Sequence, residues 1–322
     1  MPAKAGIYVF LGEIMKISII GAGNVGATIA HICLMKNLGD IYLLDIAEDM
    51  AKGKAIDLNQ SKFLFNSKFS VEGGSDYSVL SNSDFIIITA GLARKPGMSR
   101  DDLLFKNFEI VRDICLKIKE LKKEYFIIVV SNPLDIMAYT AYQTLGFSKS
   151  KVLGMAGVLD TYRYMHYIQK KLNTNTTDIK ALTLGSHGDT MVPVTSLTKT
   201  DGKSLSSILS PGEIAEIENK TKNGGAEIVA LLKTGSAYYA PAASTVRMIE
   251  AIANNENVVL PCSVYTQGEY GINDIFIGLP VLLNKNGFEK IEIINLSDEE
   301  MSALKKSAEA ISEQINKIKN KF

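Results

Sequence analysis

The stretch that decides the fold is Ile17-Ser18-Ile19-Ile20-Gly21-Ala22-Gly23-Asn24-Val25-Gly26, and the run Ala27-Thr28-Ile29-Ala30-His31-Ile32 follows it. A short apolar run ends on three glycines spaced Gly-x-Gly-x-x-Gly, and a helical pattern begins directly after them. This order predicts a strand that turns into a helix at a loop for a dinucleotide pyrophosphate. Gly21 permits the tight turn, Gly23 lets the backbone approach the pyrophosphate, and Gly26 lets the helix pack closely on the strand.

A carboxylate follows the next apolar run, Ile41-Tyr42-Leu43-Leu44, at Asp45. In a nucleotide-binding βαβ unit, a carboxylate at this place accepts hydrogen bonds from the adenine ribose. It would also repel a 2′-phosphate, which favours NAD over NADP as the cofactor. The alternative is that Asp45 only caps the helix that follows.

Length and charge limit the class of protein. A chain of 322 residues and 35.1 kDa predicts two domains of about 150 residues each. Lys plus Arg and Asp plus Glu both number 35, so the formal net charge is zero. This balance argues against a broad surface for nucleic acid or anionic membrane. No apolar run approaches the ~20 residues needed to span a bilayer.

The cysteines and the first residues indicate the compartment. Cys33, Cys115 and Cys262 lie far apart in apolar runs, so we expect small core residues in a reducing cytoplasm rather than disulfides or metal ligands. Residues 1–14 lack the features of a signal peptide, and we interpret them as an N-terminal extension with little role in the fold. His31 and His166 lie in helical patterns without metal-ligand spacing, so we expect structural roles for them.

In the first half of the chain, β-rich runs alternate with helical patterns. The predicted strands are Tyr42–Leu44, Phe69–Glu72, Phe85–Thr89 and Tyr125–Val130, with helices at Asp49–Gln60 and Leu103–Leu121 among them. Continuous apolar strands separated by helices are typical of a parallel sheet buried on both faces. Residues 15–157 are therefore predicted to form an α/β, doubly wound dinucleotide-binding domain.

The second half, residues 158–322, is predicted to be an α+β domain that binds substrate and shares a cleft with the first. The expected elements are a helix at Val158–Lys171, strands at Ile179–Leu184 and Val192–Leu197, long helices near Gly224–Ala253 and a last helix at Glu299–Ile318.

His187 is the strongest catalytic candidate and lies in the Gly-rich run Leu184–Thr190. Asp160 and Arg163 stand one helical turn apart, so they share a helix face; one can meet His187 while the other holds a carboxylate. An imidazole oriented by a carboxylate near a guanidinium is suited to proton transfer to a carboxylate-bearing substrate. The alternatives are a solvated loop histidine and an exposed helical ion pair.

Two loops follow strands at the same sheet edge. Residues 91–102 come after the Phe85–Thr89 strand, where doubly wound sheets bind ligands, and Arg94 and Arg100 can close over a substrate there. An ordinary solvated basic loop is the alternative. Val130-Ser131-Asn132-Pro133 ends another strand; the Asn132 amide can donate and accept, and the backbone before it can border a nicotinamide.

Taken in order, these motifs resemble the NAD-dependent lactate/malate dehydrogenase family, and within it the malate dehydrogenases that are similar to lactate dehydrogenases. The resemblance runs from Met15 to near the C-terminus, and only the prefix before Met15 departs from it. It rests on Gly-Ala-Gly-Asn-Val-Gly at 21–26, Arg-Lys-Pro-Gly-Met-Ser-Arg at 94–100, Ser-Asn-Pro at 131–133, Leu-Asp-Thr-Tyr-Arg at 159–163 and Gly-Ser-His-Gly-Asp at 185–189.

The resemblance implies a role for each candidate residue. His187 is the proton donor and acceptor, Asp160 its partner, and Arg163 the ligand of the substrate's C1 carboxylate. Arg100 polarises the carbonyl, and Asn132 and Asn107 contact substrate and cofactor. Arg94 holds the position that is Gln in lactate dehydrogenases and Arg in malate dehydrogenases, and Ala237 leaves room for the larger substrate.

The expected activity is therefore reversible hydride transfer between (S)-malate or oxaloacetate and NAD, a reaction of the tricarboxylic acid cycle. The family forms dimers and tetramers, so we expect a homo-oligomer. A lactate or other 2-hydroxy-acid dehydrogenase is one alternative, and a non-catalytic NAD-sensing scaffold is another.

Overall fold

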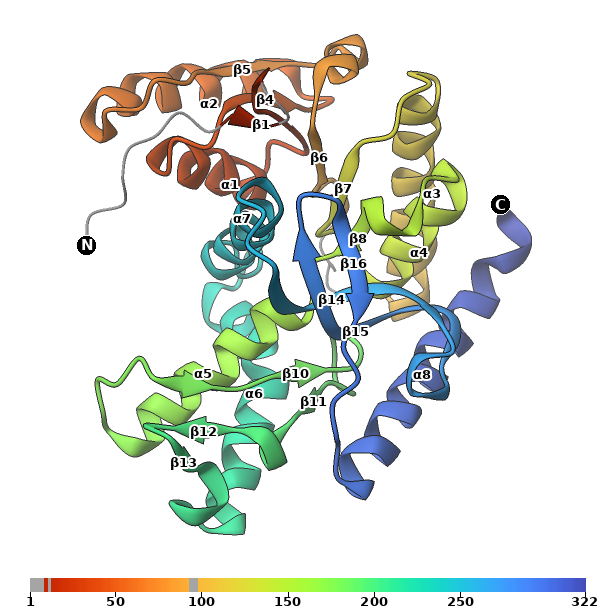
Figure 1. Ribbon diagram of the computed structural model, residues 1–322. Coiled ribbons are helices and arrows are strands. Elements are labelled where there is room, and N and C mark those ends of the chain that lie inside the picture. Colours follow the sequence, from red (N-terminus) through yellow and green to blue (C-terminus); the bar gives the residue numbers. More distant parts are fainter. Residues whose placement is uncertain (1–8, 11–12, 93–97) are drawn as a thin grey trace.

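A central sheet organises the computed structural model, which describes residues 9–10, 13–92 and 98–322 (Figure 1). Within these residues a nine-stranded sheet has the order β16-β15-β14-β8-β7-β6-β3-β4-β5. Its strands are β3 (Lys16–Ile20), β4 (Asp40–Leu44), β5 (Val71–Gly74), β6 (Phe85–Ile88), β7 (Phe126–Val129), β8 (Val152–Gly154), β14 (Val258–Gln267), β15 (Asn273–Asn284) and β16 (Gly287–Ile291).

The strands from β8 to β5 run parallel, which confirms the doubly wound α/β fold. The chain moves from β3 outward through β4 to β5, then returns to the other side of β3 and continues through β6 and β7 to β8. The loops that follow β3 and β6 therefore diverge at the carboxyl edge. Such a switch point is where open α/β sheets bind their ligands.

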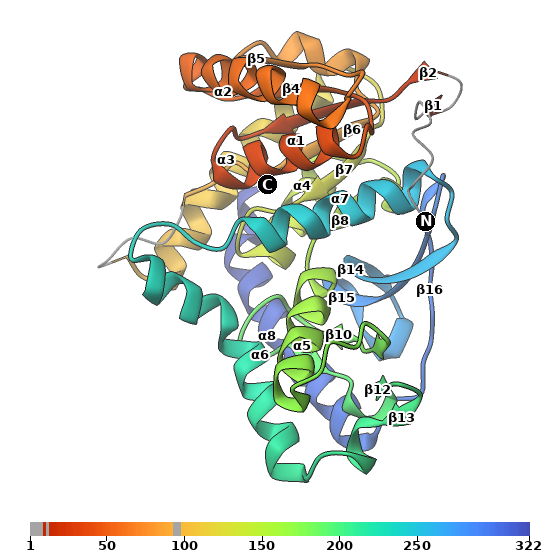
Figure 2. The same cartoon turned by 90° about the vertical axis from the view of Figure 1, so that its left-hand side faces the viewer.

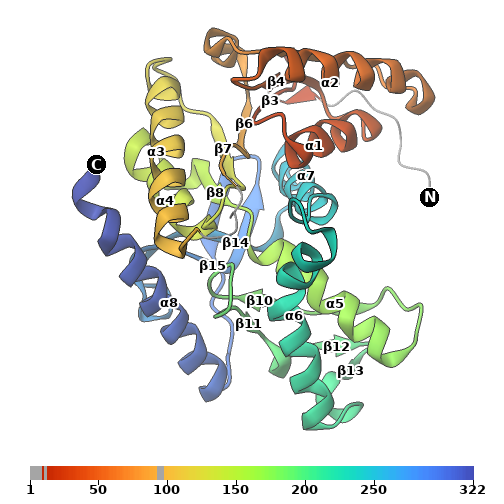
Figure 3. The same cartoon turned by 180° about the vertical axis from the view of Figure 1, so that it is seen from behind.

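Helices cover both faces of this sheet. Figures 1 and 3 show α3 and α4 on one side and α1 and α7 on the other, and Figure 2 shows α7 lying along α1. The helices are α1 (Asn24–Met35), α2 (Glu48–Ser61), α3 (Arg100–Lys119), α4 (Leu134–Leu145), α5 (Gly157–Leu172), α6 (Pro211–Leu232), α7 (Tyr239–Ala253) and α8 (Asp298–Ile318).

Three of these helices begin at a serine followed three residues later by an acidic residue. The serine side chain accepts from the backbone of the acidic residue, whose carboxylate in turn accepts from the serine backbone. This reciprocal cap satisfies amide groups that the first turn leaves without helical partners. The pairs are Ser99 with Asp102 before α3, Ser210 with Glu213 before α6, and Ser297 with Glu300 before α8.

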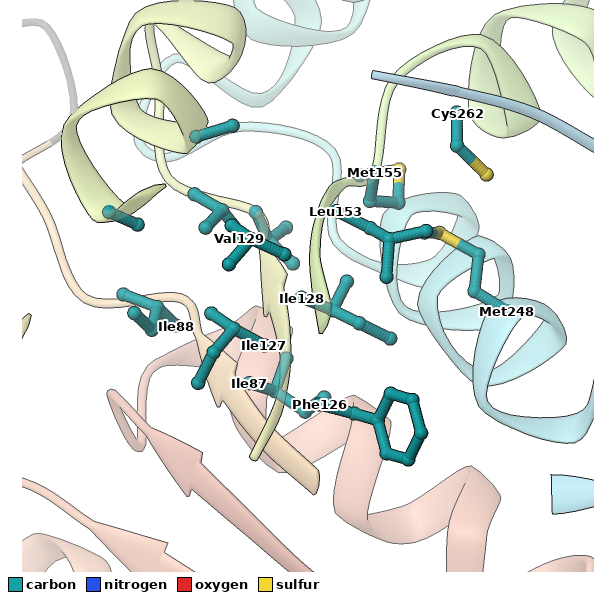
Figure 4. Packing of buried hydrophobic residues seen from close by; sticks show 14 of the residues in the cluster. Ile87, Ile88, Phe126, Ile127, Ile128, Val129, Leu153, Met155, Met248 and Cys262 are labelled. Carbon is teal, nitrogen blue, oxygen red and sulfur yellow. The ribbon is translucent and has the colours of Figure 1, made fainter. Parts of the chain in front are cut away.

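The core lies where the strands pass between the two helical layers. Figure 4 shows side chains of β6, β7 and β8 packed with Met248 of α7 and Cys262 of β14. Every residue of β6 and β7 is buried, as expected for parallel strands covered on both faces. Within the described chain, all three cysteines are buried and free of disulfides, and burial raises the pKa of each thiol.

The second half of the chain differs from the prediction in several places. The predicted strand Ile179–Leu184 divides into β9 (Ile179–Lys180) and β10 (Thr183–Leu184), because only the ends of this run find partner strands. The predicted strand Val192–Leu197 keeps only β11 (Val192–Pro193), and a 3₁₀ turn at Thr195–Leu197 replaces the rest. A small sheet joins β9 to β12 (Lys199–Thr200) and β13 (Lys203–Ser204).

The main sheet also extends past residue 157. The strands β14, β15 and β16 come from the second half and add antiparallel pairs to the parallel sheet. The junction between the two halves is the pairing of Ser263 in β14 with Gly154 in β8. A side chain at position 154 would come within 2.9 Å of the Ser263 Cβ and 2.7 Å of Leu134, so the glycine permits this close approach.

Part of the N-terminal extension forms a separate hairpin. β1 (Val9–Phe10) pairs with β2 (Glu13–Ile14) in the antiparallel sense and does not join the main sheet. Residues 1–8 and 11–12 lie outside the described residues. In the described part of the chain, every helix is too short or too polar to cross a membrane.

Candidate active site

The Gly-rich loop connects β3 to α1 at the switch point. Gly21 has a φ of 109°, and a Cβ there would lie 2.6 Å from the Thr89 hydroxyl oxygen. A Cβ at Gly26 would overlap the carbonyl oxygen of Gly21, so this glycine lets the helix fold back against the strand. Gly23 differs, because a Cβ there would meet nothing within 4 Å. The first turn of α1, which begins with Asn24 and Val25, therefore faces open space in which its free N–H groups can bind an anion.

Asp45 directly follows β4, and its side chain is hydrogen-bonded to the Gly-rich loop. Its Oδ2 accepts from the backbone N–H of Ala22 at 2.7 Å, and its Oδ1 accepts from the N–H of Ala47 at 2.9 Å. Lys54 of α2 donates to the carbonyl of Ala22 at 2.6 Å. The carboxylate thus both fixes the Gly-rich loop and supports the turn before α2. Each carboxylate oxygen has a second lone pair, so these bonds leave acceptor capacity for a ribose hydroxyl.

The ends of β6 and β7 are joined by side chains of the neighbouring loop and helix. The Ser131 hydroxyl donates to the Ala90 carbonyl at 2.5 Å, and Val130 is buried beside it. The buried Asn107 amide of α3 donates to the carbonyls of Asn132 and Leu92, at 2.6 and 3.1 Å. These bonds bring the two predicted loops together at the carboxyl edge of the sheet.

His187 lies in a cluster with Asp160 and Arg163. The ring Nδ1 of His187 is 2.8 Å from Oδ2 of Asp160, and Nη1 of Arg163 donates to the other carboxylate oxygen at 3.1 Å. The side chains of His187, Asp160 and Arg163 are 16%, 2% and 11% exposed. Asp160 therefore orients both cationic groups, and within the described residues the ring Nε2 of His187 has no hydrogen-bond partner.

Electrostatics favour the protonated imidazole. Burial by itself would lower the pKa of His187, and the Arg163 charge acts in the same direction. The charge and hydrogen bond of Asp160 act the other way, with a further contribution from the Asp135 carboxylate. The net effect raises the pKa of His187 above its ordinary value of 6.5. With its pKa raised in this way, His187 keeps its proton to a higher pH than a free imidazole does, and an imidazole can act as both proton donor and proton acceptor.

Glycines of α6 make space for Arg163. A Cβ at Gly224 would lie 2.7 Å from the Cδ of Arg163 and 3.1 Å from its Nε. A Cβ at Gly225 would lie 3.8 Å from its Nη2. The guanidinium therefore lies against helix backbone, where a bulkier residue would displace it from Asp160.

A cavity of about 500 Å³ opens over His187. Its walls come from the loops after β7 and β10 and from α3, α4 and α8, and they include Asn132, Ser186 and Ile311. Arg100 lines it as well, 77% exposed, and donates to Asp189 of the His187 loop at 2.8 Å. Lys317 of α8 pairs with Asp101 at 2.7 Å. Two ion pairs thus connect the start of α3 to the other walls of the cavity, one to the His187 loop and one to α8.

Two further pocket residues were predicted from the sequence, Arg94 and Ala237. Arg94 lies outside the described residues, so its contact with a substrate stays a prediction. Ala237 lies in the segment between α6 and α7 and is half-buried, and it is not among the residues that line the cavity over His187.

Sequence reasoning missed Asp135, which lies in the first turn of α4. Its carboxylate accepts from the backbone N–H of His187 at 2.9 Å and from the Ser263 hydroxyl at 2.7 Å. Burial raises its pKa to about 6, although both hydrogen bonds oppose the rise. The available signal was that Asp135, two positions after Pro133, is the only charged residue of α4.

Among the described residues, no group of three or more His, Cys, Asp or Glu side chains is arranged to hold a metal ion. The His31 ring packs edge-on against Phe65, and the His166 ring lies beside Tyr167.

Comparisons with known proteins identify the family of the chain. Residues 15–154 match the family model of the lactate/malate dehydrogenase NAD binding domain, and residues 157–322 match that of the alpha/beta C-terminal domain. A malate dehydrogenase of Roseiflexus sp. (strain RS-1) is 48% identical over 304 residues, which cover 94% of this chain and 98% of the relative.

Solved structures give the same result. The malate dehydrogenase of Cryptosporidium parvum has a TM-score of 0.93 and 44% identity, covering 95% of this chain and 99% of its own. The lactate dehydrogenase of that organism, complexed with lactic acid and NAD, has a TM-score of 0.91 and 38% identity, covering 96% and 99%. With both halves matched by its two domain models, the chain is a member of the lactate/malate dehydrogenase family and carries that family's NAD-binding domain.

Proposed function

We propose that this protein is an NAD-dependent malate dehydrogenase that transfers hydride reversibly between (S)-malate and NAD⁺, forming oxaloacetate and NADH. The observation that carries the proposal is the buried cluster of His187, Asp160 and Arg163 below a cavity at the carboxyl edge of the sheet. The Gly-rich loop and Asp45 lie at the same edge. Malate dehydrogenases among the relatives support the choice of substrate.

The residues at the switch point fit NAD. The backbone of Gly21-Ala22-Gly23-Asn24-Val25-Gly26 would hold the pyrophosphate, because Gly23 leaves open space beside the first turn of α1. Asp45 would accept from the adenine ribose, and Val130, Ser131 and Asn132 would border the nicotinamide with the support of Asn107. When bound, NADH supplies the hydride that reaches the ketone carbon.

The proton step belongs to His187. As an imidazolium it donates from Nε2 to the substrate oxygen, where negative charge develops as the ketone is reduced. Asp160 holds the proton on Nδ1 and stabilises the charged ring. In the oxidation of malate the neutral ring takes the proton back, so each direction needs a different protonation state.

The arginines bind and polarise the substrate. Arg163 pairs with Asp160 through Nη1, and its other N–H groups can hold the C1 carboxylate in a bidentate fork. Arg100 would leave its exposed pair with Asp189 to polarise the substrate carbonyl. Arg94 would pair with the distal carboxylate of oxaloacetate, which pyruvate lacks. An unpaired buried guanidinium facing the pyruvate methyl would cost about 2–5 kcal/mol.

The deciding experiment compares oxaloacetate with pyruvate as NADH-dependent substrates. The parent enzyme is expected to show a kcat/KM for oxaloacetate at least about thirtyfold higher, the lower limit of that cost. Arg94→Gln should reduce this ratio sharply, whereas Arg100→Gln should slow both substrates alike, since both present the same carbonyl. An unchanged ratio in Arg94→Gln would leave only a 2-hydroxy-acid dehydrogenase. Binding of NADH without turnover of either substrate would favour the scaffold alternative.

We also propose that the enzyme acts in the cytoplasm as a homo-dimer or homo-tetramer. Buried free thiols are typical of reducing compartments. Ile56, Phe63 and Leu64, on α2 and the turn after it, are 60%, 76% and 82% exposed, and such patches commonly mark interfaces. Light scattering on the purified chain tests the oligomeric state.

A further inference from the structure

A second buried carboxylate lies beneath the catalytic loop, and the proton step proposed above does not use it. Asp135 is 4% exposed, and both of its oxygens are hydrogen-bonded. Oδ2 accepts from the backbone N–H of His187 at 2.9 Å, and Oδ1 accepts from the Ser263 hydroxyl at 2.7 Å. Ser263 in turn lies at the pairing of β14 with β8. One side chain therefore connects α4 and the catalytic loop to the junction of the sheet.

The charges around His187 come from several elements. Asp160 and Arg163 face it from α5, and Asp135 faces it from α4. Asp189 of its own loop pairs outward with Arg100, and Lys317 of α8 pairs with Asp101. Glu313 of α8 lines the same cavity. Asp135 faces His187, Asp160 and the neutral Ser263. The positive charge of Arg163 is already paired with the Asp160 carboxylate. The Asp135 carboxylate therefore adds to the negative charge that acts on the imidazole.

We infer that Asp135 is a positioning residue for the reaction, one that fixes the backbone of His187 and stabilises its protonated ring in addition to Asp160. The inference rests on the acid–base role proposed for His187. A carboxylate is suited to both tasks, because its two oxygens accept from two donors while its charge stays close to the ring. Burial strengthens the effect, since the surrounding medium screens the charge weakly.

The substitution Asp135→Asn separates the charge from the hydrogen bonds. The backbone N–H of His187 can only donate, so the single amide oxygen of the new side chain must face it. The amide NH₂ then faces Ser263, whose hydroxyl can turn to accept. The variant thus retains both contacts and loses only the negative charge.

The measurement is the titration of His187 in the ligand-free protein by NMR. The chain has three histidines, so the His187 signal is assigned by its loss in His187→Asn. Asp135→Asn is expected to lower the midpoint by roughly half a pH unit or more, because one nearby negative charge is removed. The pH profiles of oxaloacetate reduction and malate oxidation should both shift to lower pH by the same amount as the midpoint. Above the midpoint, reduction falls about threefold for each half unit.

Thr144→Val is the matched control on the same helix. The buried Thr144 hydroxyl donates to the Thr140 carbonyl at 2.8 Å, so its removal weakens α4 without changing any charge. This variant should melt at a lower temperature with an unchanged His187 midpoint. If Asp135→Asn fails to fold, Ser263→Ala replaces it. Loss of that donor raises the pKa of Asp135 further and should give a smaller shift in the same direction.

The outcomes separate this inference from the proposed function. A midpoint that stays unchanged in Asp135→Asn, or in Ser263→Ala where it is the folded variant, overturns the inference, as does an equal shift in Thr144→Val. A shifted midpoint in a protein that turns over no 2-oxo acid supports the electrostatic role and rejects the proposed function. A shift in both the NMR titration and the kinetic profiles supports both.

Discussion

Replacing Asp160 with Asn should disable His187 as an acid without disturbing the cofactor site. Arg163 is a pure donor, so the single oxygen of the new amide must face it. The amide NH₂ group then faces Nδ1 of His187, which must accept a hydrogen bond and cannot carry a proton. Because the imidazolium needs protons on both nitrogens, the variant disfavours the protonation state that we propose for oxaloacetate reduction.

The size of the loss follows from burial. Asp160 is 2% exposed and makes charge-assisted contacts of 2.8 and 3.1 Å. Removal of one partner from a buried ion pair costs about 3–5 kcal/mol. If the transition state bears that cost, turnover falls by roughly two to nearly four orders of magnitude, at about 1.4 kcal/mol per tenfold.

The assay is oxaloacetate reduction at saturating NADH, with NADH affinity measured separately by fluorescence. Affinity should stay within about twofold of the parent, because Asp160 touches no residue of the Gly-rich loop in the described contacts. The double variant His187→Asn/Asp160→Asn should be little slower than His187→Asn alone, since Asp160 acts through the ring. Full additivity of the two losses, or a loss below about fivefold in the single variant, would refute the reasoning.

Further expectations concern the same residues. Because the pKa of His187 is raised above 6.5, the rate of oxaloacetate reduction should fall as pH rises through this pKa, and the rate of malate oxidation should fall as pH decreases through it. His187→Asn should lower turnover by a factor of about 10² or more. Two identical profiles, measured where chemistry limits the rate, would contradict this. Asp45→Ser should weaken NAD binding and improve NADP binding, and unchanged constants for both cofactors would remove Asp45 from the site. Gly26→Ala should lower the free energy of unfolding by at least about 2 kcal/mol, since its Cβ would overlap the Gly21 carbonyl. Gly23→Ala should leave the stability unchanged and weaken NADH binding. Equal melting curves for the two variants would count against these packing roles.

The sequence predicted the elements whose signal is local. The glycines at 21, 23 and 26 and the apolar run before them identify a strand, a turn and a helix within a few residues, and β3 and α1 lie there. The helix at Glu299–Ile318 agrees with α8 to within one residue, since its apolar spacing and its serine cap are both local. The cluster of His187, Asp160 and Arg163 was predictable because helical spacing places two of its members on one face.

The elements that were missed depend on distant partners. β14 and β15 contain Pro261 and Pro280, which stand opposite each other in the ladder, and neither residue favours a strand by itself. Their pairing is stabilised by contacts along two long strands, which no short window reveals. Asp135 was missed for the same reason, because its partners lie 52 and 128 positions away in the chain.

The junction between β8 and β14 also has a consequence for how the protein is made. Ser263 is synthesised 109 residues after Gly154 (263 minus 154), so the edge of β8 leaves the ribosome long before its partner strand exists. At ~5–20 residues per second, that edge waits roughly 5–20 s with its backbone groups unpaired. An unpaired edge of a buried, apolar strand readily pairs with another chain. The first half of this protein is therefore most vulnerable to aggregation during translation, before β14 has been added.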